Sequence, residues 1–191
     1  MVKNNWSIIT AGHDYDIITT NMIEFGGDYS PAQELFYTPI KYWYGSAVYP
    51  QPRDSNTQKI IVHVCNTWKI WKHTGYDKDL EERWPGIRER YIKNCKMELG
   101  YCQFIRVGKN IIVVNVVAED GLKNAYNSMP LDYLFLEKGL LCLALIAYDM
   151  GASIHMPRLA CDSAGGDWKL IAHLIDRVFR VRHIDVNVYD I

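Results

Sequence analysis

Clusters of positive charge are missing from this sequence. Its 21 Lys and Arg residues are balanced by 22 Asp and Glu residues, which leaves a formal net charge of −1 over 191 residues. Proteins that bind duplex nucleic acid or an anionic membrane surface carry a basic patch instead. The sequence also lacks any run approaching the ~18 consecutive apolar residues that span a bilayer. We therefore expect a cytoplasmic protein with no membrane and no duplex nucleic acid among its partners.

Cysteine and histidine residues with metal-site spacing are missing as well. The five cysteines are odd in number and scattered, and no two form a CxxC pair. This pattern is typical of reduced thiols rather than of disulfides or a zinc site. The histidines are scattered in the same way. We expect neither a bound metal nor a cofactor.

Internal repeats and low-complexity tracts are also absent, and residues 1–191 are expected to form a single domain. A hydrophobic content of 49% suffices for one well-buried core. Tyrosines and prolines are concentrated in residues 29–56, which we interpret as an ordered, aromatic-rich insertion. Its aromatic rings could pack as a lid on the body of the domain or offer a surface for stacking on a base.

Along the rest of the chain, apolar runs alternate with segments of helical period. Strands are predicted at 8–10, 16–20, 22–25, 59–64, 101–107, 110–117, 152–159 and 184–189, and helices in the part of 80–93 that follows Pro85, at 131–150 and at 168–180. This order predicts an α/β fold with helices on both faces of a mostly parallel sheet. Ligands of such sheets bind at the carboxyl ends of the strands.

The segment 156–168, MPRLACDSAGGDW, joins a predicted strand to a predicted helix at such an end. A helix N-terminus presents unpaired backbone N–H groups and the positive end of the helix dipole, and small residues let an anion approach closely. The candidates for binding a phosphate are therefore Ser163, Ala164, Gly165 and Gly166. Alternatively, the glycines of such a turn can have a purely steric role, with no part in binding a ligand.

This segment resembles the second phosphate-binding loop of macro domains, in the branch of ADP-ribose 1''-phosphate phosphatases and terminal ADP-ribose glycohydrolases. The segment 61–66, IVHVCN, resembles the strand that enters the first loop of that family, and Gly27 and Asp28 resemble its early Gly-Asp pair. The segments 110–117, 168–179 and 184–189 match its later elements in order. The resemblance implies a three-layer α/β/α macro-domain-like fold with a mixed central sheet.

The resemblance also implies a small-molecule ligand of the ADP-ribose class. Asp28 would contact the adenine, Asn66 would lie near the distal ribose, and the two loops would wrap the diphosphate. A carboxylate can accept a hydrogen bond from the adenine amine, and backbone amides can bind a diphosphate without arginines.

The first loop departs from the family pattern. Residues 67–76 read TWKIWKHTGY, in which Gly75 stands alone where three or four glycines are expected. The larger side chains would crowd the distal ribose and the diphosphate. Lys72 and His73 could donate to a terminal phosphate, with His73 acting as acid or base, or they could belong to a solvated loop.

Three further positions bear on catalysis. Asp162 replaces a glycine and could be a general acid or base, or a surface turn residue. Glu119 and Ala164 occupy the positions of the lysine and the aspartate that glycohydrolase relatives use. Neither side chain can form a Schiff base, and glycohydrolysis by that route is therefore not expected.

Two main functions remain open, and the sequence does not decide whether the protein is an enzyme. It could hydrolyse ADP-ribose 1''-phosphate, with Asn66 positioning the ribose and His73 or Asp162 handling the proton. It could instead be a non-catalytic reader or sequestering protein for an ADP-ribose-derived or cyclic nucleotide signal. In a third interpretation, Trp68 and Trp71 fill the pocket and the fold serves protein contacts.

Overall fold

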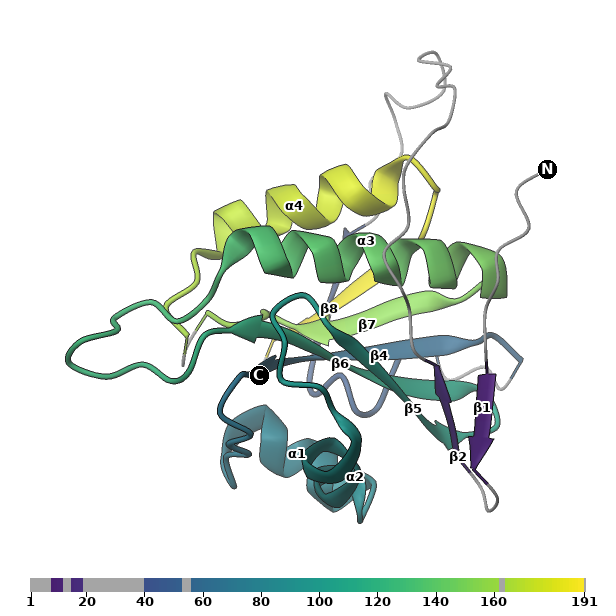
Figure 1. Cartoon of the computed structure of the whole chain (residues 1–191). Helices are drawn as coiled ribbons and strands as arrows, with labels where there is room; N and C mark the ends of the chain where they lie inside the picture. Colours follow the sequence, from purple (N-terminus) through teal and green to yellow (C-terminus); the bar gives the residue numbers. More distant parts are fainter. Residues whose placement is uncertain (1–7, 12–14, 19–39, 53–55, 162–163, 191) are drawn as a thin grey trace.

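The computed structural model describes residues 8–11, 15–18, 40–52, 56–161 and 164–190 (Figure 1). The candidate site residues Asp28, Asp162 and Ser163 lie outside these ranges, as does the strand expected at 22–25.

A six-stranded sheet forms the centre of the molecule, with the strand order β3-β8-β7-β4-β6-β5. Neighbouring strands run parallel except for β5 and β6, which are antiparallel. The strands are β3 (Ile40–Tyr44), β4 (Lys59–Asn66), β5 (Cys102–Gly108), β6 (Ile111–Glu119), β7 (Ser153–Pro157) and β8 (Val186–Asp190). The predicted mixed sheet is thereby confirmed.

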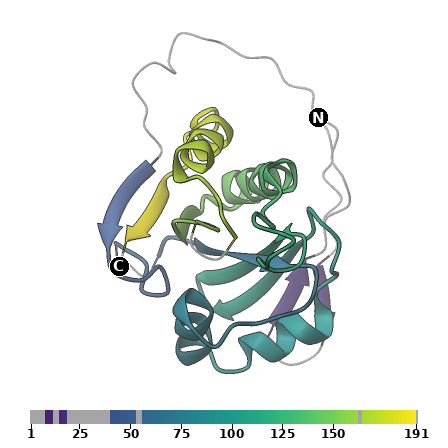
Figure 2. The same cartoon turned by 90° about the vertical axis from the view of Figure 1, so that its left-hand side faces the viewer.

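Helices cover both faces of this sheet, as Figures 1 and 2 show. One face carries α1 (Gly75–Arg83) and α2 (Ile87–Asn94), and the other carries α3 (Tyr133–Met150) and α4 (Trp168–Arg180). The three-layer α/β/α prediction is therefore confirmed. The first of these helices was not predicted, because the expected helical segment lay after Pro85. No described helix is both long enough and apolar enough to cross a membrane.

Local signals in the sequence set the ends of α3 and α4. The Asp132 carboxylate accepts hydrogen bonds from the N–H groups of Leu134 and Phe135 at 2.9 and 3.2 Å, which caps the start of α3. Gly151 ends the same helix with a φ of 59°, as the sequence predicted. Asp167 caps α4 by accepting a hydrogen bond from the Lys169 N–H at 2.8 Å.

The two faces of the sheet differ in polarity. The face under α3 and α4 is lined by aliphatic residues such as Ile60, Val62 and Val114. On the other face a polar row interrupts the core. It consists of Gln103, Asn115, His63, His155 and Asn187, all at most 5% exposed. Buried polar groups cost free energy unless they are hydrogen-bonded, so we expect these residues to be hydrogen-bonded to one another or to their neighbours.

Residues 40–44, within the segment expected as an insertion, form the edge strand β3, which pairs with β8. The Trp43 indole Nε1–H donates to Asn187 Oδ1 at 2.7 Å and so joins the edge strand β3 to the polar row. A separate antiparallel hairpin consists of β1 (Ile8–Ala11) and β2 (Tyr15–Ile18), close to the first two strands predicted.

Candidate functional site

Loop 1 comprises residues 66–75 and leaves the carboxyl end of β4. Its first residue, Asn66, is 4% exposed. The Asn66 side-chain carbonyl accepts from the Trp68 and Ile70 N–H groups at 3.1 and 3.0 Å, and its amide donates to the Ile70 carbonyl at 2.7 Å. In this conformation both ends of the Asn66 amide therefore hold loop 1 in shape. Binding of a ribose by this side chain would require these bonds to open.

Loop 1 is fastened to the segment that follows β6. The Thr67 N–H donates to the Glu119 carbonyl at 2.9 Å, and the Thr67 hydroxyl donates to Asp120 Oδ1 at 3.1 Å. The same hydroxyl accepts from the Gly121 N–H at 3.0 Å. A Cβ at Gly121 would lie only 2.7 Å from the Trp68 ring, so this glycine allows the ring to approach the backbone closely. The Trp68 side chain remains 58% exposed.

Loop 2 comprises residues 158–167 and leaves the carboxyl end of β7. It contacts the far end of the same segment after β6, hereafter the bridging segment (120–132). The Leu131 N–H of this segment donates to the Ala164 carbonyl at 3.4 Å. Directly after the segment, the hydroxyl of Tyr133 at the start of α3 accepts from the Asp167 N–H at 2.7 Å. The bridging segment thus connects both loops at the carboxyl ends of the strands, hereafter the edge that carries the site.

The candidate phosphate-binding residues of loop 2 differ in burial and in whether the structure already uses their N–H groups. The Gly166 N–H donates to the Ala160 carbonyl at 2.9 Å, and a Cβ at Gly166 would lie 2.8 Å from Leu131 Cδ2. Gly166 therefore closes the turn and does not offer a free donor. Ala164 is fully buried, whereas Gly165 is partly exposed, has a φ of 74° and donates its N–H to no acceptor among the described residues. Of these three residues, Gly165 is therefore the best suited to donate its N–H to an anion.

The remaining candidates lie where loop 1 enters α1. Gly75 begins the helix with a φ of 56°, and a Cβ there would meet nothing within 4 Å. Its role is conformational rather than to allow a close approach. The His73 side chain is 63% exposed, and its Nδ1 lies 3.2 Å from Glu81 Oε2 on α1. His73 is therefore engaged with the helix.

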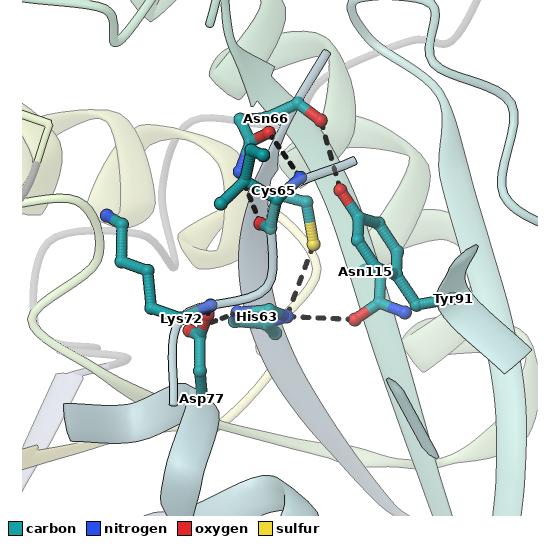
Figure 3. A network of polar contacts seen from close by, with 8 residues as sticks. His63, Cys65, Asn66, Lys72, Asp77, Tyr91 and Asn115 are labelled. Carbon is teal, nitrogen blue, oxygen red and sulfur yellow. Dashed lines mark hydrogen bonds and ion pairs between the residues drawn. The ribbon is translucent and has the colours of Figure 1, made fainter. Parts of the chain in front are cut away.

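Behind loop 1 lies the hydrogen-bonded network of Figure 3. His63 Nε2 is 2.9 Å from Asp77 Oδ1, and His63 Nδ1 is 3.0 Å from Asn115 Oδ1. The other Asp77 oxygen accepts from the Lys72 N–H at 2.7 Å, while the Lys72 side chain extends away from the imidazole. The Tyr91 hydroxyl donates to the backbone carbonyl of Asn66 at 3.0 Å. The network thereby ties β4, β6, α1 and α2 to the base of loop 1.

The orientation of neighbouring amides fixes the charge of His63. The Gln103 amide nitrogen donates to the Arg90 carbonyl at 3.1 Å, so its oxygen accepts from Asn115 Nδ2 at 2.8 Å. This leaves the Asn115 oxygen facing His63 Nδ1, which favours a proton on Nδ1; the Cys65 Sγ lies 3.2 Å from the same nitrogen. Because Nε2 faces a carboxylate, it must donate too. His63 is therefore an imidazolium paired with the Asp77 carboxylate.

The pKa shifts agree with this assignment. Burial acts to lower the pKa of His63, but Cys65 and Asp77 outweigh it and raise the pKa well above its ordinary value. Burial raises the pKa of the Cys65 thiol, whereas the neighbouring His63 acts to lower it. Burial acts to raise the pKa of Asp77 as well, but His63 and the Lys72 N–H lower it below its usual range.

Sequence reasoning missed this network, although one signal was present. Asn115 and Gln103 interrupt strongly apolar strands, and a polar residue at a buried strand position requires a partner. The described residues contain no group of three or more His, Cys, Asp and Glu side chains that could hold a metal ion.

The protein thus has a three-layer α/β fold. The loops after β4, β6 and β7 meet at the carboxyl ends of these strands and form one site. No family model matches the sequence. The mouse (Mus musculus) chromodomain-helicase-DNA-binding protein 1-like is 27% identical over 179 residues, covering 86% of this chain and 19% of that protein. This chain therefore spans about a fifth of the length of that relative.

Solved structures show a closer correspondence. A protein of unknown function from Bacteroides thetaiotaomicron has a TM-score of 0.72 and 30% identity, covering 81% of this chain and 99% of that one. A macrodomain protein from Streptomyces coelicolor has a TM-score of 0.66 and 30% identity, covering 80% and 99%. Thermosipho africanus DarTG, in complex with ADP-ribose, is 16% identical with a TM-score of 0.58 over 78% and 41% of the two chains, a likeness of fold alone. The identity to the Streptomyces protein over nearly its whole length shows that this chain belongs to the macrodomain family.

Proposed function

We propose that this macrodomain binds ADP-ribose or a related nucleotide at the edge formed by loop 1, the bridging segment and loop 2. One observation carries the proposal: the bridging segment joins the two loops at the carboxyl ends of the strands, and beside it Gly165 keeps an uncommitted N–H before α4. Membership in the macrodomain family and the ADP-ribose complex of the DarTG structure support the choice of ligand.

The diphosphate would accept a hydrogen bond from Gly165 and face the N-terminus of α4. Ser163 would extend this binding surface along loop 2, and Lys72 would add positive charge from loop 1, whereas the fully buried Ala164 would support the loop from below. Asp28 would accept from the adenine amine. Asn66 would act mainly by holding loop 1, because its side chain is bonded to the backbone of that loop.

Hydrolysis of ADP-ribose 1''-phosphate is the more specific form of this proposal, and a non-catalytic reader is its alternative. Hydrolysis requires a group that handles a proton beside the phosphate. His73 is engaged with Glu81 and the Asn66 amide with loop 1, an arrangement that favours the reader. The hydrolase would then rely on Asp162. Glycohydrolysis through a lysine is not proposed, because Glu119 and Ala164 provide no amine.

Titration calorimetry with ADP-ribose tests the binding proposal. We expect saturable binding by the wild type and a roughly twofold to fivefold weaker affinity for Lys72→Met, since a partly exposed charge contributes about 1 kcal/mol or less. Lys109→Met is the matched control, because Lys109 lies exposed in the β5–β6 turn, before β6 begins. Absence of wild-type binding at millimolar ligand would refute the proposal.

Release of inorganic phosphate from ADP-ribose 1''-phosphate distinguishes the two forms. The reader predicts no release above the uncatalysed rate at high protein concentration. Release that scales with protein concentration and disappears in Asp162→Asn would support the hydrolase instead.

A further inference from the structure

Glu119 ends β6 directly beneath loop 1. Its backbone pairs with Asn66 across a β-bulge, and its carbonyl accepts the Thr67 N–H at 2.9 Å. Val117, two residues earlier on β6, packs in the core cluster that includes residues of α1 and α2, so the alternation of side chains along a strand places Glu119 on the same face. The charges of Lys72, His63 and Asp77 act on its pKa. Glu119 therefore faces the base of loop 1.

The Glu119 carboxyl group has no hydrogen-bond partner among the described residues. The residue is only 4% exposed, yet neither carboxyl oxygen takes part in a hydrogen bond with any described residue. A nearly buried carboxyl group without a partner costs about 1–3 kcal/mol or more, and such groups are rare outside functional sites.

The carboxyl group is also not sealed off from solvent. Four buried side-chain polar atoms of the described residues have no hydrogen-bond partner and no solvent contact, namely Gln58 Oε1, Trp71 Nε1, Tyr76 Oη and Arg88 Nε. The Glu119 oxygens are not among them, so the small exposed part of this residue includes its carboxyl end. A ligand at the edge can therefore reach it.

We infer that Glu119 is a specificity-determining residue, which binds hydroxyl groups of the terminal ribose and selects against a phosphate at that position. This inference rests on the proposed binding of ADP-ribose. In the proposed pose the diphosphate would lie at Gly165 in loop 2 and the terminal ribose would extend toward loop 1, to which the Glu119 backbone is bonded. A carboxylate can accept two hydrogen bonds from a ribose diol, as acidic residues do in dinucleotide-binding sites.

Electrostatics explain the selection. Two negative groups in a partly buried site repel each other, whereas neutral hydroxyls satisfy the carboxylate. Burial raises the pKa of Glu119, with Lys72 and His63 acting in the opposite direction, so the group is also costly to leave charged and unpaired. The positive charge of Lys72 lies near Glu119, but the Lys72 side chain extends from loop 1 and is partly exposed to solvent.

Calorimetry of Glu119→Gln and Glu119→Met with ADP-ribose, ADP and ADP-ribose 1''-phosphate tests this inference. We expect ADP-ribose to bind roughly tenfold or more weakly to Glu119→Met, and less weakly to Glu119→Gln, while ADP, which lacks the terminal ribose, changes less than about twofold. The preference for ADP-ribose over its 1''-phosphate should fall in both variants. Glu98→Gln removes an exposed carboxylate before β5 and serves as the matched control.

The outcomes separate the two claims. Wild-type binding of ADP-ribose that is unchanged in both Glu119 variants would overturn the role of Glu119 and leave the proposed function standing. Equal losses for ADP and ADP-ribose would also overturn it, since they would indicate a general effect on the fold. If the wild type bound none of the three nucleotides, the proposed function would fail first.

Discussion

Replacing Asp77 by Asn should destabilise the protein strongly although it changes one atom. Asp77 accepts from the His63 imidazolium at 2.9 Å and from the Lys72 N–H at 2.7 Å. Asn can accept only one of these bonds, so it removes the ion pair: either a donor faces the new NH2 group, or His63 gives up its Nε2 proton and accepts from that group. Breaking a buried ion pair costs about 3–5 kcal/mol, and because the Asp77 side chain is 18% exposed we expect about 3 kcal/mol. At ~2–4 °C per kcal/mol, the Tm should fall by roughly 6–12 °C.

The difference in Tm between wild type and Asp77→Asn should depend on pH in a defined way. The pKa of His63 is raised, so its stabilisation is complete below the ordinary value of 6.5 and is lost as the pH rises through the folded-state pKa. The pKa of Asp77 is lowered, so its stabilisation is complete above 3.8 and is lost as the pH falls through the folded-state pKa. The difference should therefore be largest between these two ordinary values and shrink on both sides.

Thermal melts followed by circular dichroism measure this difference. Glu82→Gln is the control, because Glu82 forms an exposed ion pair with Lys78 on the same helix and its loss should change stability by about 0.5 kcal/mol or less. A Tm for Asp77→Asn close to that of Glu82→Gln at every pH would refute the charged pair.

Two further predictions concern packing and thiol chemistry. Gly139→Ala should lower the free energy of unfolding by about 1–3 kcal/mol in urea titrations, because the new methyl group would collide with Val116 on β6; a change near zero would show that α3 can move away at little cost. The buried thiols of Cys65, Cys95 and Cys102 have raised pKa values, for Cys65 and Cys95 through burial and for Cys102 through its hydrogen bond to Cys142 and burial, so they should react with a thiol reagent only on unfolding. Rapid labelling of any of the three in the native protein, located by mass spectrometry, would contradict this.

The sequence predicted those parts of the fold that depend on local pattern. The apolar stripe of α4, its Asp167 cap and the C-terminal Gly151 of α3 are signals within one or two turns of the chain. The edge strand β3 was missed because its pairing with β8 joins residues far apart in the sequence, and its own residues are aromatic and largely exposed. Hydrophobic periodicity carries no information about such a partner.

The position of the small residues of loop 2 between a strand and a helix was predicted, whereas their bonding was not. The Gly166 N–H donates to the Ala160 carbonyl, a contact that depends on how the loop closes. Asn66 was correctly placed at the end of β4, but only the structure shows that its amide is bonded to Ile70. His63 and Asp77 could not be paired from the sequence, because the start of α1 at Gly75 was not predicted.

A crystal structure of the protein with ADP-ribose is the most direct test of the central claim. We expect a diphosphate oxygen within hydrogen-bond distance of the Gly165 N–H and the terminal ribose hydroxyls within hydrogen-bond distance of the Glu119 carboxylate. Nucleotide bound away from loops 1 and 2, or an edge that stays without ligand at saturating ADP-ribose, would contradict it.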